Sequence, residues 1–70
     1  EEYYENGQLK LTVGIRNGLK HGNFIEYFEN GVVKIRGKYK EDKMQGMWSY
    51  YADDGELIEK KKFREGKEIR

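Results

Sequence analysis

Apolar and polar residues alternate with a period of two along most of this chain. In one such stretch the apolar positions are Val33, Ile35 and Tyr39, and lysine or arginine occupies the even-numbered positions from 34 to 40. Such alternation is typical of an antiparallel strand that is buried on one face only. No segment keeps the period of an amphipathic helix. The pattern therefore predicts an all-β chain, a single-layer antiparallel meander of about six strands of roughly 6–9 residues each.

Turn-forming dipeptides separate these strands. Three of them recur at a fixed place in the pattern: Asn6-Gly7, Asn30-Gly31 and Asp54-Gly55. Both residues of such a pair tolerate positive φ, so the pairs favour two-residue hairpin turns. Longer loops that contain glycine are expected at residues 16–22 and 41–46. The chain is thus predicted to be a row of stacked β-hairpins, elongated and twisted.

A two-residue turn also fixes the cross-strand partners. The predicted pairs are Phe28 with Val33, Glu26 with Ile35, Phe24 with Gly37, Gly22 with Tyr39, Trp48 with Lys61 and Gly46 with Phe63. In this register Gly22, Gly37 and Gly46 are candidates for positions where an aromatic ring lies over bare backbone. A three-residue turn with a bulge would shift the register, and the sequence leaves that alternative open.

The sequence repeats every 24 residues without a gap. The segment YYENG at residues 3–7 returns as YFENG at 27–31 and, less closely, as YADDG at 51–55. Internal periods of 20–50 residues usually indicate stacked supersecondary units. We therefore predict a single repeat domain over residues 1–70, with copies at about 2–25, 26–49 and 50–70. Because the chain begins with Glu, we expect it to be part of a longer array.

The spacing of glycines and aromatic residues is similar to that of a known repeat. The residues concerned are Gly22, Phe24, Tyr27, Phe28 and Gly31, followed in the next copy by Gly46, Trp48, Tyr51 and Gly55. This pattern resembles the bacterial variant of the MORN repeat. The chain departs from it where Val13 and Lys61 replace the glycine found at Gly37, where Phe24 replaces the usual tryptophan, and where Ala52 replaces the second aromatic residue.

The resemblance to the MORN repeat carries expectations about fold and function. It implies an elongated, twisted, single-layer sheet. Bacterial proteins built of this variant are often grouped with antitoxin-like families. Eukaryotic relatives act in protein assembly, and contacts with membrane phospholipids have also been proposed for them. The resemblance thus implies a scaffold that binds a partner protein, with an antitoxin-like role as the more specific expectation.

Composition limits the chain to a thin domain. Its 70 residues are 39% charged and 36% hydrophobic, with six Tyr, three Phe and one Trp to supply apolar area. The charges nearly cancel, at a net +1, and cysteine is absent, so neither a disulfide nor a thiolate metal site exists. No apolar run exceeds three residues, which excludes a signal peptide or transmembrane helix within these residues. Localisation stays open, with the cytoplasm slightly favoured.

Residues capable of catalysis are sparse and badly placed. His21, the one histidine, corresponds to Gln45 in the next copy, and both precede a glycine, so we interpret His21 as a polar turn residue. Ser49 and Thr12 have no histidine near them in the chain. The acidic residues at 53–56 replace ENGV at a hairpin turn, and no phosphate-binding glycine motif occurs. The sequence predicts no enzyme activity, no cofactor and no metal site.

Two surfaces are candidates for binding. One face is expected to carry a column of tyrosines, Tyr3, Tyr27 and Tyr51, together with Arg36 and several lysines, Lys10, Lys34, Lys38, Lys60 and Lys62. Tyrosine and arginine are enriched in protein interfaces. The opposite face is expected to carry most of the apolar side chains, of which Phe24 and Trp48 are the candidates for contact with a partner. For both surfaces, simple packing within the scaffold is the alternative interpretation.

The sequence therefore favours a non-enzymatic scaffold that binds a protein partner by masking its surface or by strand pairing. Self-association through open sheet edges is a further possibility. The main alternative is peripheral binding to an anionic membrane through the basic strand face. Nucleic acid is disfavoured, since the net charge is small, although lysines and aromatic residues alternate as in some nucleic-acid-binding surfaces. The identity of the partner does not follow from the sequence.

Overall fold

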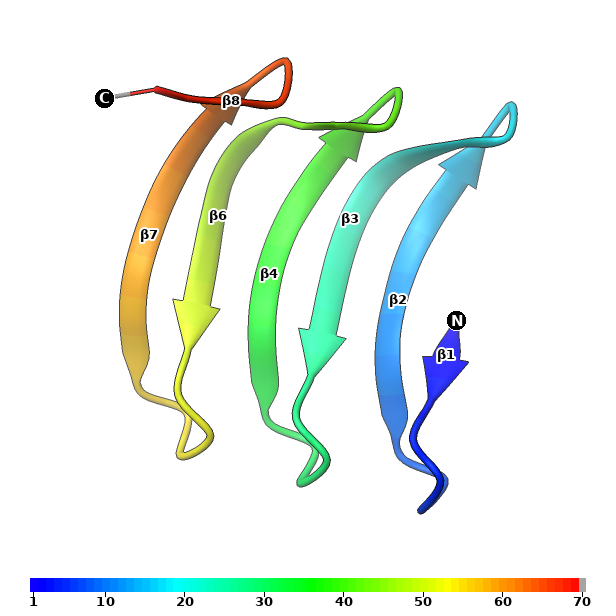
Figure 1. The fold of residues 1–70 in the computed structure, drawn as a ribbon, viewed down its shortest axis with the longest axis vertical. Helices are drawn as coiled ribbons and strands as arrows, with labels where there is room; N and C mark the ends of the chain where they lie inside the picture. Colours follow the sequence, from blue (N-terminus) through cyan, green and yellow to red (C-terminus); the bar gives the residue numbers. More distant parts are fainter. Residues whose placement is uncertain (70) are drawn as a thin grey trace.

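The protein forms one antiparallel β-sheet, which confirms the predicted fold class (Figure 1). The computed structural model describes residues 1–69, so Arg70, the last residue of the predicted third copy, lies outside it. The strands are β1 Glu2–Tyr3, β2 Leu9–Arg16, β3 Leu19–Tyr27, β4 Val33–Lys40, β5 Lys43–Met44, β6 Gly46–Tyr51, β7 Leu57–Arg64 and β8 Lys67–Ile69. Their order in the sheet is β1-β2-β3-β4-β6-β7-β8, with β5 paired to β4 beside β6.

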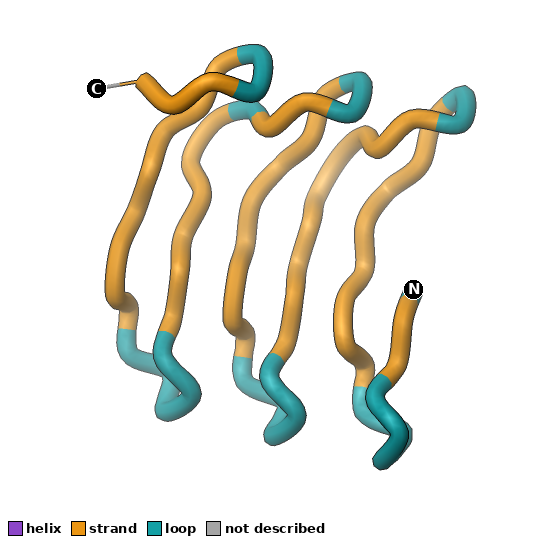
Figure 2. The backbone as a smooth tube through the Cα atoms, viewed as in Figure 1, coloured by secondary structure: helices purple, strands orange, loops and turns teal. Residues whose placement is uncertain are grey.

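The sheet is a single curved layer. Its principal extents are 34 × 30 × 11 Å, so one dimension is little more than the thickness of a sheet with its side chains. The backbone path in Figure 2 shows two rows of turns at opposite ends of the strands. We name them the lower turns, at residues 5–7, 29–31 and 53–55, and the upper turns, at residues 17–18, 41–42 and 65–66.

The upper turns are the tight ones, which corrects the prediction of long loops there. Arg16 pairs with Leu19, and the two residues between them, Asn17 and Gly18, have φ angles of 52° and 78°. Two successive positive φ angles define a type I′ hairpin turn, whose twist matches that of the flanking strands. The turns at 41–42 and 65–66 repeat this geometry. The glycines at 22 and 46 lie further along, within or at the start of strands.

The lower turns have three residues rather than the predicted two. In the central copy the Phe28 amide donates to the Val32 carbonyl (2.8 Å), and the Gly31 amide donates to the Phe28 carbonyl (2.9 Å). Gly31 has a φ of 88°, as expected for the left-handed third residue of such a loop. The other two lower turns have the same pair of hydrogen bonds. The predicted pairing of Phe28 with Val33 is therefore wrong, because Tyr27 pairs with Val33.

A bulge next to each lower turn restores the predicted register. Tyr27 pairs with Val33 but Glu26 pairs with Ile35, so Lys34 is an extra residue on β4. The equivalent register shifts lie beside Lys10 on β2 and Ile58 on β7. The extra residue in the turn and the extra residue in the strand compensate each other. The remaining predicted pairs are confirmed: Glu26 with Ile35, Phe24 with Gly37, Gly22 with Tyr39, Trp48 with Lys61 and Gly46 with Phe63.

Aromatic rings gather around Trp48 on one face, which we name the ring face. The indole is 2% exposed, the only buried hydrophobic side chain among residues 1–69. Its centroid lies 5.1 Å from Tyr39, 5.4 Å from Phe24 and 6.2 Å from Phe63, with edge-on or stacked geometry. Such aromatic pairs each add about 0.5–1.5 kcal/mol beyond the area they bury.

Gly37 is the glycine over which the indole lies. A Cβ built at Gly37 would overlap the Trp48 ring, so the prediction for this position is confirmed, although the ring belongs to the neighbouring strand β6. The prediction is wrong for Gly22 and Gly46. Both have positive φ angles, 99° and 76°, and a Cβ there would meet nothing within 4 Å. These two glycines are therefore required by their backbone conformation, and not by a ring that fills the place of a side chain.

Hydrogen bonds between turns connect consecutive copies. The Asn30 side-chain amide donates to the Asp53 carbonyl (2.9 Å), while its Oδ1 accepts from the Val32 amide (2.9 Å). Asn6 makes the same pair of bonds one copy earlier, at 3.5 and 3.0 Å. Asp54 keeps the acceptor bond, to the Glu56 amide, but a carboxylate has no N–H to donate. Only the asparagines of the first two copies therefore donate a hydrogen bond to the turn of the next copy.

We expect the substitution Asn30→Asp to lower the free energy of unfolding by about 1 kcal/mol, the net value of one hydrogen bond. The carboxylate retains the acceptor bond and loses only the donor to the next turn. Asp54→Asn is the control, since it reverses the charge change without removing a donor. Urea unfolding of both variants shows whether the lost hydrogen bond or the added negative charge lowers the stability. If the Asp54→Asn variant gains as much stability as Asn30→Asp loses, local charge and not the amide bond is responsible.

Candidate functional site

Four cations lie together on the face opposite the aromatic cluster, which we name the basic face. They are Arg36 and Lys38 on β4, and Lys60 and Lys62 on β7. Directly paired residues share a face of the sheet. Arg36 pairs with Ser49, which pairs with Lys60, and Lys62 pairs with Met47, so the strand β6 runs between the two pairs of cations.

The bulges place a mixed aromatic and aliphatic row at the lower end of the basic face. Tyr3 pairs with Leu9, Tyr27 with Val33 and Tyr51 with Leu57. Most apolar side chains were predicted on the ring face, but the shift of one residue at each bulge moves Leu9, Val33 and Leu57 to the basic face. The tyrosine column thus has apolar neighbours. Tyr3 is 59% and Leu57 44% exposed, while Tyr27 and Tyr51 are half-buried.

The bulges also remove two predicted lysines from the basic face. Lys34 Nζ lies 3.6 Å from Glu26 Oε2 and 5.5 Å from the centre of the Phe28 ring. Glu26 pairs with Ile35 and Leu11, which places it on the ring face. Lys10 lies over the Tyr4 ring in the equivalent position. The placement of Lys10 and Lys34 beside the tyrosine column is therefore wrong.

The six residues proposed as contact sites divide between the two faces. Tyr27, Tyr51 and the exposed Arg36 lie on the basic face, with Tyr3 at its lower corner. Phe24 and Trp48 lie together on the ring face, where their rings stack. Because Trp48 is 2% exposed, its side chain supports the sheet and is not presented at the surface.

The Tyr3 hydroxyl has a neighbour that affects its ionisation. It donates to Glu1 Oε1 at 3.0 Å. This hydrogen bond, together with the negative charge of Glu1, raises the pKa of Tyr3 above its ordinary value of 10.0. At neutral pH the Tyr3 side chain is thus a neutral hydrogen-bond donor.

A recess of about 320 Å³ lies on the basic face over β3, β4 and β6. Sequence reasoning missed two of its residues, Asn23 and Met47, which occupy equivalent positions one repeat apart. Met47 is 58% exposed. Aligning the copies could have identified this position. Asn23 and Met47 lie two residues before Ile25 and Ser49, the cross-strand partners of Arg36, and therefore share its face of the sheet. The recess is lined by Asn23, Arg36, Lys38, Gln45 and Met47, and by the backbone of Gly37 and Gly46.

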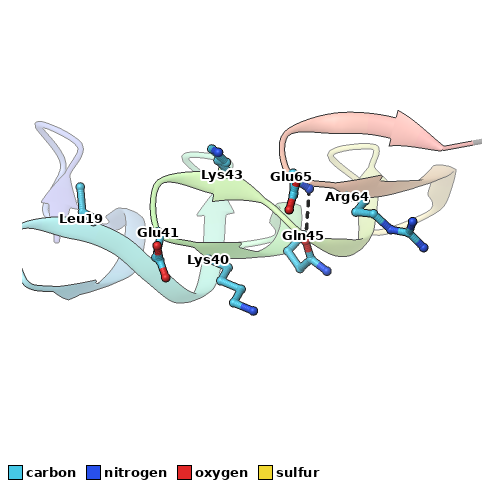
Figure 3. Close-up of a pocket in the computed structure, with 7 residues that line it drawn as sticks. All are labelled: Leu19, Lys40, Glu41, Lys43, Gln45, Arg64 and Glu65. Carbon is cyan, nitrogen blue, oxygen red and sulfur yellow. Dashed lines mark hydrogen bonds between the residues drawn. The ribbon is translucent and has the colours of Figure 1, made fainter.

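A second kind of groove lies between successive upper turns. The groove in Figure 3, of about 560 Å³, is lined by Lys40, Glu41, Lys43, Gln45, Arg64 and Glu65, with Leu19 at one end. A smaller groove has the equivalent residues of the preceding copy, among them Arg16 and His21. Gln45 Oε1 accepts a hydrogen bond from the Glu65 amide (3.3 Å), so this side chain joins the two turns.

The upper grooves are lined mainly by charged and amide side chains. Charges of both signs line them, with no hydroxyl or thiol nucleophile among the lining residues. His21 occupies the position of Gln45, and its buried Nδ1 has no hydrogen-bond partner within residues 1–69. In the same part of the chain, no group of three or more His, Asp or Glu residues could hold a metal ion. Nor does that part include a helix of the length and apolarity needed to cross a membrane.

Charge is strongly separated along the strands, although the net charge is only +1. Residues 1–8, 26–32 and 51–56, which contain the lower turns, carry eight of the 13 carboxylates and none of the 14 lysines and arginines. Within residues 1–69 all the cations belong to strands, and none lies in a turn. Outside these three segments the 14 cations are accompanied by only five carboxylates, so the small net charge conceals a local excess of positive charge.

Comparison with protein families gives one match. The model of the family described as MORN repeat variant matches residues 1–13 and 20–41, which together are half of the chain. The matched residues include two of the three lower turns and the strands β2, β3 and β4 in whole or in part. No curated protein matches the chain. No solved structure matches it either.

Proposed function

The chain belongs to the MORN repeat variant family, a non-catalytic type of repeat module for protein or membrane-lipid interaction, and from that premise we propose that it binds a partner protein through its basic face. The observation that carries the proposal is the composition of this uncovered face. It presents tyrosines, aliphatic side chains and four cations on one side of a sheet that is 11 Å thick.

The large exposed area of the chain supports the proposal that one of its surfaces contacts a partner protein. The chain exposes 5242 Å², whereas a compact monomer of 8.4 kDa is expected to expose roughly 4,600 Å². A sheet normally buries a face against another layer. Here the aromatic cluster covers only the ring face, and no second layer within residues 1–69 covers the basic face.

The more specific proposal is an antitoxin-like role. In it, the chain masks a toxin-like partner protein in a stoichiometric complex, as the resemblance to the bacterial form of the repeat implies. We further propose that the three copies belong to a longer array, which would extend the basic face. Pairing of a partner strand with residues 57–61 of β7, which β8 leaves uncovered, is a weaker mode, since Lys60 and Lys61 disfavour association of sheet edges.

The proposal is tested by capture of proteins from the native cells on the immobilised chain, identified by mass spectrometry. Tyr51 and Tyr50 are adjacent on β6, half-buried alike, and face opposite sides of the sheet. We expect Tyr27→Ala/Tyr51→Ala to weaken retention of a specific protein about 5- to 30-fold, the effect of losing interface tyrosines. Tyr50→Ala should retain it. The proposal is wrong if no captured protein distinguishes these variants.

A further inference from the structure

The four cations of the basic face have no carboxylate beside them. The two ion pairs within residues 1–69 join Lys34 to Glu26 and Lys61 to Glu59, and both lie on the ring face. The recess around Arg36 and Lys38 is lined by side chains that are cationic, amide or apolar, with no acidic one among them. Its polar groups can therefore donate hydrogen bonds to an anion without repulsion from a neighbouring carboxylate.

The spacing of these cations fits an extended chain. Arg36 and Lys38 are two residues apart on one strand, which places their Cα atoms about 6.6–6.8 Å from each other. Lys60 and Lys62 repeat this spacing on β7, two strands away at about 9–10 Å. In an extended peptide, side chains on the same side are also about 6.6–6.8 Å apart. The exposed Met47 between the two rows offers an apolar contact.

We propose that the basic face binds an acidic, extended segment of a partner protein. One carboxylate of the segment occupies the recess between Asn23, Arg36 and Lys38, and the next acidic side chains pair with the remaining cations. The segment's backbone crosses the exposed Met47. This inference rests on the proposed protein-binding function and specifies the chemistry of the partner.

Other polyanions fit the surface less well. Single-stranded nucleic acid needs aromatic rings on which bases stack, but the clustered rings lie on the opposite face. The tyrosines on the basic face lie beside the lower turns, whose carboxylates repel phosphates. An anionic membrane is charged over a wide plane and would meet those carboxylates as well as the lysines. A short acidic peptide can contact the cations alone.

The test measures binding of a fluorescein-labelled eight-residue oligoglutamate peptide by fluorescence anisotropy, at about 20 mM and about 150 mM salt. The matched variants are Arg36→Gln/Lys38→Gln on the basic face and Lys34→Gln/Lys61→Gln on the ring face. Both remove two positive charges, so only the position of the charges differs. We expect salt-sensitive binding that falls about tenfold in the first variant and less than about twofold in the second. Circular dichroism of both variants checks that they are folded.

Three results would overturn the inference. They are absence of peptide binding at low salt, equal losses in the two variants, and tighter binding of an eight-residue oligothymidylate or of phosphatidylserine-containing vesicles than of the peptide. The outcome of the protein-capture experiment does not depend on the outcome of the peptide-binding experiment. If the peptide does not bind while Tyr27→Ala/Tyr51→Ala loses a protein that Tyr50→Ala retains, the acidic-segment inference falls and the protein-binding function stands.

Discussion

Trp48→Ala is expected to lower the melting temperature by about 15–30 °C. Truncation of a buried tryptophan costs about 3–5 kcal/mol, and each kcal/mol shifts the melting temperature of a domain of this size by about 4–8 °C. The indole is the centre of the aromatic cluster, and its Nε1 also donates to the Lys38 carbonyl (3.2 Å). The total stability of a chain of this length is roughly 4–10 kcal/mol, so one side chain accounts for a large part of it.

Met47→Ala is the matched control for this loss. Met47 precedes Trp48 on β6 but lies 58% exposed on the basic face, so its truncation should change stability by about 0.5 kcal/mol or less. Thermal unfolding followed by far-ultraviolet circular dichroism measures both variants. A melting temperature of the Trp48→Ala variant within about 5 °C of the Met47→Ala variant would show that the cluster does not hold the sheet together.

Gly37→Ala is expected to destabilise the protein by about 1–3 kcal/mol through overpacking. Its backbone is extended, so conformation permits any residue, but the Trp48 ring occupies the space that a Cβ needs. Gly7→Ala provides the contrast. At Gly7 a Cβ would have open space, and the cost of about 1–2 kcal/mol comes only from the φ of 87°.

A double-mutant cycle identifies the cause of the Gly37→Ala loss. In a Trp48→Leu background the ring is gone, so the added methyl group should cost less than in the natural chain, with a coupling of about 1 kcal/mol or more. Urea unfolding of the four proteins measures that coupling. Strict additivity would mean that the methyl group acts through the backbone, and that the close approach of ring and glycine is not what requires Gly37.

The repeat and the strand register were predictable because they depend on local, periodic signals. Alternation located the strands, and the spacing of Asn-Gly pairs gave the correct partners for Phe24 and Trp48. Beyond the bulge the register prediction succeeded despite a wrong turn type, whereas the pair of Phe28 with Val33 beside the turn was wrong. The lower turn has one residue more than assumed, and the bulge at Lys34 adds one residue to the facing strand.

The tight turn at Glu41-Asp42 was not predictable from local signals, since neither residue is glycine. Both have positive φ, and contacts with the preceding copy hold them. The Asp42 amide donates to the Lys20 carbonyl (2.8 Å), and Asp42 Oδ1 accepts from the Lys20 amide (2.7 Å). Such support comes from a residue 22 positions away, which a reading of the dipeptide alone cannot include.

The candidate site was predictable only in part, for a related reason. Tyr27, Tyr51 and Arg36 follow the alternation and share the expected face. Lys34 follows it too, but the bulge turns it toward Glu26 on the other face. A bulge depends on how two strands meet, and the sequence of one strand carries little signal for it. The recess at Met47 was missed because a methionine on the polar side of a strand suggests no contact by itself.

The order of strands in the sheet has a consequence for how the protein folds. Apart from the short β5, strands that follow each other in the sequence are neighbours in the sheet, so every hairpin closes a short loop and then docks on its neighbour. All-β proteins usually fold slowly, because distant segments must find each other first. This chain avoids that search. Folding can begin at any of the hairpins and then propagate to the neighbouring hairpins on both sides.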